Sequence, residues 1–225
     1  MRSSRLVVLS LAAAAAVGLT PSVGAAQTAS GFADSWYWGA YGGVIDFATS
    51  TARVTRPSIG AEWMITRTKF ALNIFADQTY FTTTSSFANP TGAGLGTSLP
   101  ASISDMRRVG FSVMLFTPEY RAFKPYFGLG YSFNLINSAS LTGANPGATP
   151  AAQDSISQAA NAARSMGKVF GNVGVMYVYK KFAPFAQFTL MPTTGAGDWY
   201  LNGPGMTKIL SVGLRYNFGT SISSW

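Results

Sequence analysis

Residues 208–218 read KILSVGLRYNF, and from residue 210 onward every second side chain in this stretch is apolar. The apolar set is Leu210, Val212, Leu214, Tyr216 and Phe218. The side chains between them include Ser211, Gly213 and Arg215, which are small or polar. Because successive side chains of a β-strand point to opposite faces, this period of two predicts a strand with one apolar face and one polar face.

The same alternation recurs along the rest of the chain. We expect strands at 36–47, 56–66, 69–82, 106–117, 124–137, 166–179, 182–192 and 207–218. The apolar face carries no charged residue in any of these strands, and in the first strand we assign Tyr37, Tyr41, Ile45 and Phe47 to it. The opposite face is small and polar, and we assign six charged residues to it: Asp46, Glu62, Asp77, Arg108, Lys168 and Arg215. An apolar outside, a polar inside and a closed sheet are what a lipid environment requires.

The expected connections alternate in length. Short links at 66–68, 118–123 and 180–181 are typical of periplasmic turns, whereas longer links at 83–105, 139–165 and 193–206 are typical of extracellular loops, with a shorter first loop at 48–55. The sequence therefore predicts an all-β fold, an eight-stranded antiparallel transmembrane up-and-down β-barrel. The alternative is a soluble lipocalin-like barrel or sandwich, whose water-facing side should carry more charge than is present here.

The first 26 residues have the features of a secretory signal peptide. Arg2 and Arg5 precede an apolar stretch at 6–19, and small residues follow up to Ala26, after which we expect cleavage. Residues 27–225 then form the barrel. The whole chain has 16 Lys and Arg against 8 Asp and Glu, so losing the two arginines leaves 14 against 8, or +6. For an exported protein we expect anionic lipid and lipopolysaccharide phosphates, and no nucleic acid, as the partners of this charge.

Three stretches resemble a known group of proteins. They are WYWGAYGG at 36–43, KPYFGLGY at 124–131 and SVGLRYNF at 211–218, and they resemble the small bacterial outer-membrane barrels of the OmpA, OmpX and opacity-protein type. The last stretch also resembles the signal that the outer-membrane assembly machinery reads, a polar-x-Gly-x-x-aromatic-x-aromatic pattern. This sequence supplies it as Ser211, Gly213, Tyr216 and Phe218. The chain continues to Trp225, which leaves open whether Phe218 or Trp225 ends the strand. The resemblance implies an outer-membrane location and the assembly machinery as a partner.

The six charged residues assigned to the interior suggest two roles. Charges enclosed in a narrow barrel must pair, because an unpaired buried charge costs several kcal/mol, on the order of the desolvation penalty of an ion. The pairs can form a static polar plug, or a gate that opens a small pore. We favour the plug, because an eight-stranded interior has little space once its side chains are in place.

Other features have weaker interpretations. Basic residues near the loop bases could bind lipopolysaccharide phosphates or be ordinary solvated charges: Arg53, Arg56, Arg107, Arg164 and Lys208. Residues 150–164 have helical spacing of Ile156, Ala159, Ala160 and Ala163, which predicts a short helix. This helix could contact a partner or close over the barrel mouth, and we favour the closure. Interfacial aromatic girdles are expected from Tyr37, Trp63, Tyr80, Tyr131, Tyr177, Tyr179 and Tyr216.

The composition argues against catalysis. The chain has no histidine and no cysteine, and its eight acidic residues are scattered, so we expect no catalytic residues, no metal site and no cofactor. The function expected from the sequence is that of a non-enzymatic outer-membrane barrel with a structural or surface-interaction role, exercised through long extracellular loops. A narrow pore for ions or a small solute is the alternative.

Overall fold

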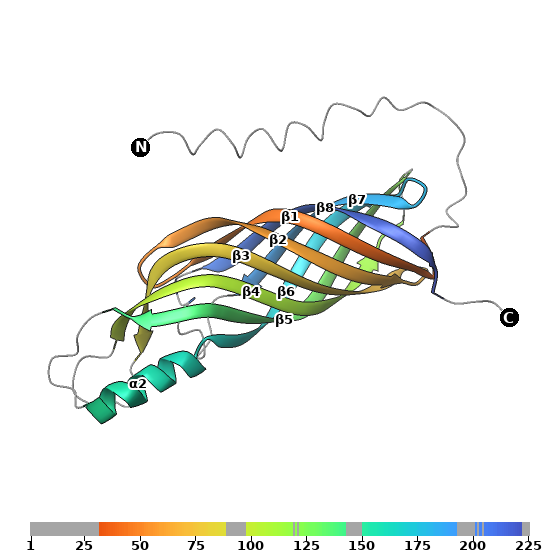
Figure 1. Ribbon diagram of the computed structural model, residues 1–225. Helices are drawn as coiled ribbons and strands as arrows, with labels where there is room; N and C mark the ends of the chain where they lie inside the picture. Colours follow the sequence, from red (N-terminus) through yellow and green to blue (C-terminus); the bar gives the residue numbers. More distant parts are fainter. Residues whose placement is uncertain are drawn as a thin grey trace.

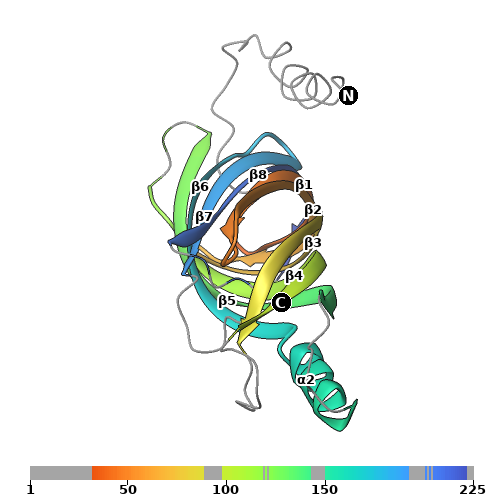
Figure 2. The same ribbon diagram turned by 90° about the vertical axis from the view of Figure 1, so that its left-hand side faces the viewer.

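The computed structural model of the chain is a closed antiparallel barrel in which every strand pairs with its sequence neighbours and β1 pairs with β8 (Figures 1 and 2). The structure describes residues 32–88, 98–118, 120, 122–142, 150–192, 201, 203 and 205–221, so the expected signal peptide at 1–26 and Trp225 lie outside the described residues. The elements are β1 (Ser35–Ala48), β2 (Arg53–Thr66), β3 (Phe70–Ala88), β4 (Ser98–Phe116), β5 (Phe123–Leu141), α2 (Pro150–Ala162), β6 (Ser165–Tyr177), β7 (Phe182–Pro192) and β8 (Met206–Thr220). This order and topology confirm the predicted fold class.

Three neighbouring strands are longer than the sequence suggested. The pairing of β2 with β3 ends at Ser58 and Thr79, but the pairing of β3 with β4 continues to Ala88 and Ser98. The expected loop at 83–105 was therefore too long, because Ser and Thr residues that we assigned to a loop extend the two strands instead. β5 extends in the same direction, to Leu141. The three strands form a ladder that rises beyond the rest of the barrel at its loop end (Figure 1).

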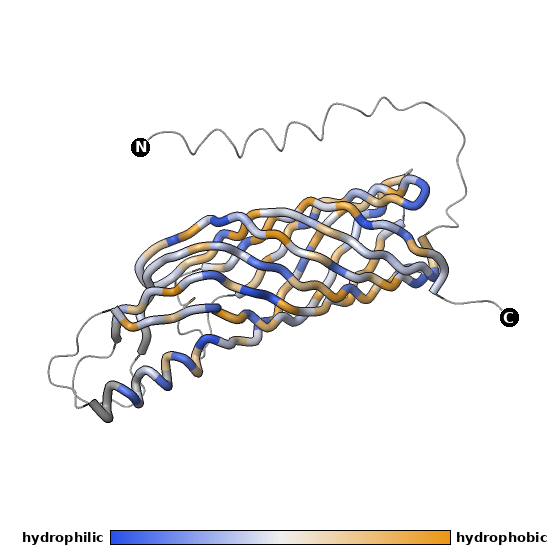
Figure 3. Tube along the Cα trace, in the orientation of Figure 1, coloured by the Kyte–Doolittle hydropathy of each residue, from blue (hydrophilic) through white to orange (hydrophobic). Residues whose placement is uncertain are grey.

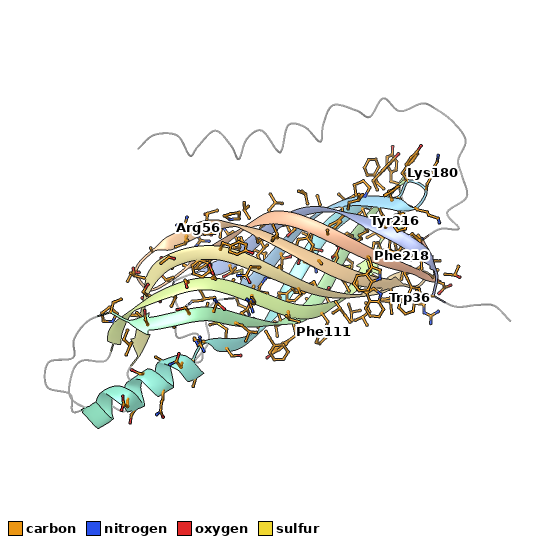
Figure 4. All side chains as sticks on the ribbon, in the orientation of Figure 1. Trp36, Arg56, Phe111, Lys180, Tyr216 and Phe218 are labelled. Atoms are coloured by element: carbon orange, nitrogen blue, oxygen red, sulfur yellow. The ribbon has the colours of Figure 1, made fainter. Side chains whose placement is uncertain are left out.

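The outer surface of the barrel is apolar, as the alternation predicted. Leu129 is 70% exposed, and the outward residues of β6 and β8, such as Val169 and Val212, are exposed to a similar degree. Figure 3 shows hydrophobic and hydrophilic positions alternating along the strands, and in Figure 4 Phe111 projects from the outside of the barrel. A water-soluble protein would not expose so many large apolar side chains around its whole circumference, so this surface fits a lipid environment.

The prediction for β1 assigned the wrong set of side chains to the outer face. Tyr37, Ile45 and Phe47 are almost completely buried inside the barrel, whereas Trp36 and Trp38 face outward. Both faces of this strand are aromatic, so its pattern alone could not fix the direction. Cross-strand packing decides it, because Trp36 lies 5.0 Å from the outward ring of Trp63. Tyr37 is therefore not part of an interfacial girdle.

The interior is not uniformly small and polar, which corrects the expectation from the sequence. Two apolar clusters fill its ends. We call the first the loop-end cluster, and its barrel members are Ile45, Phe47, Val54, Phe81, Ala101, Ile103, Met106, Ile136, Met166 and Ile209. We call the second the turn-end cluster: Phe32, Tyr37, Met64, Ala71, Met114, Phe116, Tyr126, Met176, Ala183 and Phe185. The polar side chains occupy the layer between them.

Inward glycines make room for large side chains of neighbouring strands. A Cβ atom at Gly60 would lie 2.5 Å from the ring of Tyr41, and one at Gly174 would lie 2.5 Å from the ring of Tyr126. Each tyrosine thus lies across the backbone of the next strand, in the space that a side chain would otherwise take. Aromatic rings of the neighbouring strands therefore create the crowding at these two glycines.

The helix expected at 150–164 is present as α2, and its position differs from the expected one. Ala160 is buried against the loop-end cluster and Ala163 is partly buried there, while Asp154, Ser157 and Gln158 are exposed. Figure 2 shows α2 beside the end of β5, to one side of the barrel mouth and not over it. Within the described residues, no helix is long and apolar enough to cross a bilayer.

Candidate functional site

The middle layer of the barrel contains a buried ion pair between β2 and β8. The Nε of Arg215 donates to Oε1 of Glu62 at 2.7 Å, and Nη2 donates to Oε2 at 3.2 Å. Asn73 Nδ2 donates to the same carboxylate at 3.1 Å. Arg215 is 0% exposed, so this two-point contact supplies the counter-charge that a buried guanidinium needs.

A second buried ion pair joins β3 and β4. Arg108 and Asp77 are directly opposite each other in the register, and Arg108 donates from Nε to Oδ1 of Asp77 at 3.0 Å and from Nη2 to Oδ2. The hydroxyl of Tyr41 donates to Oδ2 of Asp77 at 3.0 Å. The sequence analysis placed Tyr41 on the lipid face and so missed its role in this layer.

Aromatic rings cover the flat faces of both guanidinium groups. The Cζ of Arg215 lies 3.9 Å from the ring centroid of Phe185 and 5.6 Å from that of Tyr126, and the Cζ of Arg108 lies 5.3 Å from that of Phe75. A guanidinium is weakly hydrated and interacts favourably with an aromatic face, so these rings replace part of the water that the cations lose. The layer is thus built to hold charge permanently within the barrel.

Two of the six predicted interior charges do not belong to either of these ion pairs. Lys168 is buried and faces the interior from β6, but it is not a member of either of these two ion pairs. Asp46 faces outward at the loop end of β1, where it pairs with Arg53 and accepts a hydrogen bond from Thr55. Its assignment to the interior was wrong because it followed from the reversed facing of β1.

Free space in the polar layer is small. The cavity between the two ion pairs has a volume of about 20 Å³, which is roughly the space of a single water molecule. The loop-end and turn-end clusters fill the interior on either side of it with apolar side chains. The described side chains therefore leave little free space around the two ion pairs.

The outer rim carries some of the basic residues that the sequence indicated. Arg53 and Lys208 flank Asp46 on the outward face, directly beyond the apolar side chains of Val44 and Leu210. The Nη2 of Arg53 also donates to the carbonyl of Met206 at 3.2 Å. Arg107 is outward on β4, where it donates to Gln78 at 2.9 Å. Arg53 and Lys208 therefore lie next to the exposed apolar surface at the loop end of β1, β2 and β8.

The residues of the expected assembly signal divide between the faces of β8. Ser211 and Gly213 face the interior, and Tyr216 and Phe218 face outward. β8 pairs with β1 as far as Thr220, so the strand continues two residues beyond Phe218. The role of this motif in assembly stays a prediction.

The acidic side chains of the described residues are dispersed over the barrel. None of their acidic groups form a cluster of three that could hold a metal ion. What the buried layer offers chemically is paired charge enclosed by apolar side chains.

No family model and no curated protein matches the sequence. Among solved structures, the chain is similar to Neisserial surface protein A (NspA), with a TM-score of 0.53 and 13% identity over 81% of this chain and 97% of NspA. Ail, the attachment invasion locus protein of Yersinia pestis, gives a TM-score of 0.44 with 9% identity over 83% of this chain and 100% of Ail. The outer-membrane protein OprG of Pseudomonas aeruginosa gives 0.45 with 13% identity over 84% and 99%. The likeness to NspA shows the fold alone, a small eight-stranded β-barrel, which is the fold that the resemblance stated from the sequence implied.

Proposed function

We propose that the chain is a non-enzymatic barrel of the bacterial outer membrane that does not conduct, and that its loop end serves as a surface for interaction with other molecules. The observation that carries the proposal is the filled interior. Two apolar clusters enclose a layer of paired charges, and the cavity in that layer holds about one water molecule. Transport needs a continuous polar path, which these side chains oppose.

The loop end supports the interaction role. The β3–β4–β5 ladder rises beyond the rest of the barrel, and α2 is fixed to it through Ala160. Its exposed side chains include the neutral, polar groups of Ser157, Gln158, Ser138 and Ser140. A rigid, polar projection of this kind suits contact with another molecule outside the membrane.

Planar-bilayer conductance of the refolded protein tests whether the barrel is closed. A heat-modifiable band on a gel first establishes that the protein is folded. We expect no discrete channels from the wild type, and none from the double variant Glu62→Gln/Arg215→Gln, because both apolar clusters remain. Reproducible channels whose conductance changes in the double variant would contradict the proposal and favour the pore.

The interaction role has a separate test. Liposomes carrying the protein are added to a panel of immobilised extracellular-matrix proteins and polysaccharides. We expect saturable binding to at least one of them, which weakens when residues 150–162 of α2 are replaced by a Gly-Ser segment of equal length. Binding to none of the panel would contradict the interaction role but leave the closed barrel unaffected.

We also propose that the outward cations contact anionic lipid of the outer leaflet, since Lys208 and Arg53 lie directly beyond the apolar belt. Unfolding of the protein in vesicles with and without lipopolysaccharide tests this. We expect lipopolysaccharide to stabilise the wild type and to stabilise Lys208→Gln less. Lys181→Gln, at the opposite end of the barrel, is the matched control and should behave like the wild type. Equal stabilisation of both variants would contradict the proposal.

A further inference from the structure

The small cavity in the middle layer is lined by polar side chains that lack partners. Oδ1 of Asn73, Oγ of Ser112, Nη1 of Arg108 and both polar atoms of the Asn172 side chain have no hydrogen-bond partner among the described residues. All four residues are more than nine-tenths buried. Buried polar atoms are satisfied in nearly all proteins, so this concentration around one cavity indicates a bound molecule.

The chemistry of the lining identifies the kind of molecule. Arg108 and the Asn172 amide nitrogen are donors, the oxygens of Asn73 and Asn172 are acceptors, and the Ser112 hydroxyl is both. The two ion pairs around the cavity contribute two negative and two positive charges, so the site has no net charge that would favour an ion. The cavity volume of about 20 Å³ accommodates about one water molecule.

We propose that this cavity is a binding site for an ordered water molecule, which joins Asn172 of β6 to Asn73, Arg108 and Ser112 of β3 and β4. Such a water can accept from Arg108 Nη1 and Asn172 Nδ2 and donate to Oδ1 of Asn73 and Oδ1 of Asn172, so it matches the mixed lining. With it, the two ion pairs and β6 become one hydrogen-bonded layer across the barrel.

Two glycines of β5 show that the site is built for this approach. A Cβ atom at Gly128 would lie 2.6 Å from Oδ1 of Asn172, and one at Gly130 would lie 2.4 Å from the ring of Phe170 and 2.8 Å from Cβ of Ser112. Side chains of β4 and β6 therefore reach over the bare backbone of β5 and line the same cavity. Larger residues at these positions would fill the space between them.

The sign of a stability change tests the proposal. Asn172→Leu replaces the amide with an apolar group of similar size. If water satisfies Asn172, the substitution removes real hydrogen bonds, and we expect the folding equilibrium constant in vesicles to fall about tenfold. The matched control is Thr207→Val, because the Thr207 hydroxyl is also fully buried and without a partner in the described part of the chain, but does not line the cavity. The control should leave stability equal or higher. A rise for Asn172→Leu as well would overturn the proposal.

A direct measurement keeps the proposal testable if Asn172→Leu fails to fold. In proton-detected NMR of the labelled wild type in lipid nanodiscs, we expect a magnetisation transfer from water to the Asn172 side-chain amide. Its absence would overturn the proposal. Replacing sodium chloride with potassium or choline chloride at equal ionic strength should leave the unfolding midpoint unchanged, and a cation-specific shift would assign the cavity to an ion instead. None of these outcomes depends on whether the barrel conducts.

Discussion

Removal of the Glu62 charge is the perturbation that the structure predicts most sharply. In Glu62→Gln, the Arg215 guanidinium stays at 0% exposure and loses its counter-charge, together with two charge-assisted hydrogen bonds at 2.7 and 3.2 Å. Breaking a buried pair on one side costs about 3–5 kcal/mol. The cation–π contact with the ring of Phe185, 3.9 Å from the guanidinium, contributes at most about 1–2 kcal/mol. It is present in both the wild type and the variant, so it does not replace the lost ion pair.

The rim pair provides the internal control. Asp46 and Arg53 also form an ion pair, but their side chains are 30% and 43% exposed. Exposed pairs contribute about 0–1 kcal/mol, so Asp46→Asn should change stability little. Urea unfolding of both variants in lipid vesicles, followed by tryptophan fluorescence, compares the two sites in one protein.

A double variant separates the charge from the packing. Glu62→Gln/Arg215→Met removes both charges and keeps most of the side-chain volume, so it should recover a large part of the stability that Glu62→Gln loses, because no uncompensated ion remains. The reasoning would be refuted if Glu62→Gln lost no more stability than Asp46→Asn, since the pair would then not be enclosed as the structure shows.

Three further predictions concern packing. Gly60→Ala should lower the free energy of unfolding in vesicles by about 1–3 kcal/mol, because the new methyl group meets the ring of Tyr41. The control Gly42→Ala meets nothing closer than 3.9 Å and should be nearly neutral. Equal effects of the two substitutions would argue against the ring packing. Tyr41→Phe should cost about 1 kcal/mol by removing the donor to Asp77, and a neutral result would contradict that hydrogen bond. Ala160→Glu should release α2 from the barrel, seen as faster proteolysis at 150–162 with the folded band unchanged on a gel, and unchanged proteolysis would contradict the docking.

The sequence predicted what depends on local pattern. In β8 and β5 one face is apolar at every second residue and the other is mostly small or polar, so the strand, its facing and its lipid exposure followed directly. In β1 the same reasoning failed, because Trp36 and Tyr37 are both large aromatic residues on opposite faces. The facing of β1 is set by the packing of Trp36 against Trp63 on the next strand, and no pattern within β1 carries that information.

The interior layer was predicted only in part. Glu62, Asp77, Arg108 and Arg215 were recognised as enclosed charges, and the pairing of Asp77 with Arg108 follows from the register of one hairpin. The pairing of Glu62 with Arg215 joins residues 153 positions apart through the β1 strand between them, so it depends on barrel closure and stagger.

The apolar clusters were overlooked although a signal was present. The inward faces of β2, β4 and β6 carry Met64, Met114 and Met176. These methionines occupy the same alternating positions as the polar residues that we assigned to the interior. Methionine fills irregular spaces between other side chains, so an inward series of methionines could have indicated a filled barrel. The emphasis on small and polar residues hid it.

Two single-cysteine variants of β4 test most directly whether the barrel has lipid outside and a closed interior. The chain has no native cysteine, so Ser112→Cys inside and Val113→Cys outside each give one reporter at adjacent positions on opposite faces. In vesicles, we expect a probe at residue 113 to be quenched by lipid-borne nitroxide, and a thiol at residue 112 to react with neither lipid-borne nor water-soluble reagents. Rapid reaction of residue 112 with a small water-soluble thiol reagent would show an open interior, and reaction of residue 113 with that reagent would show that the outer face does not meet lipid.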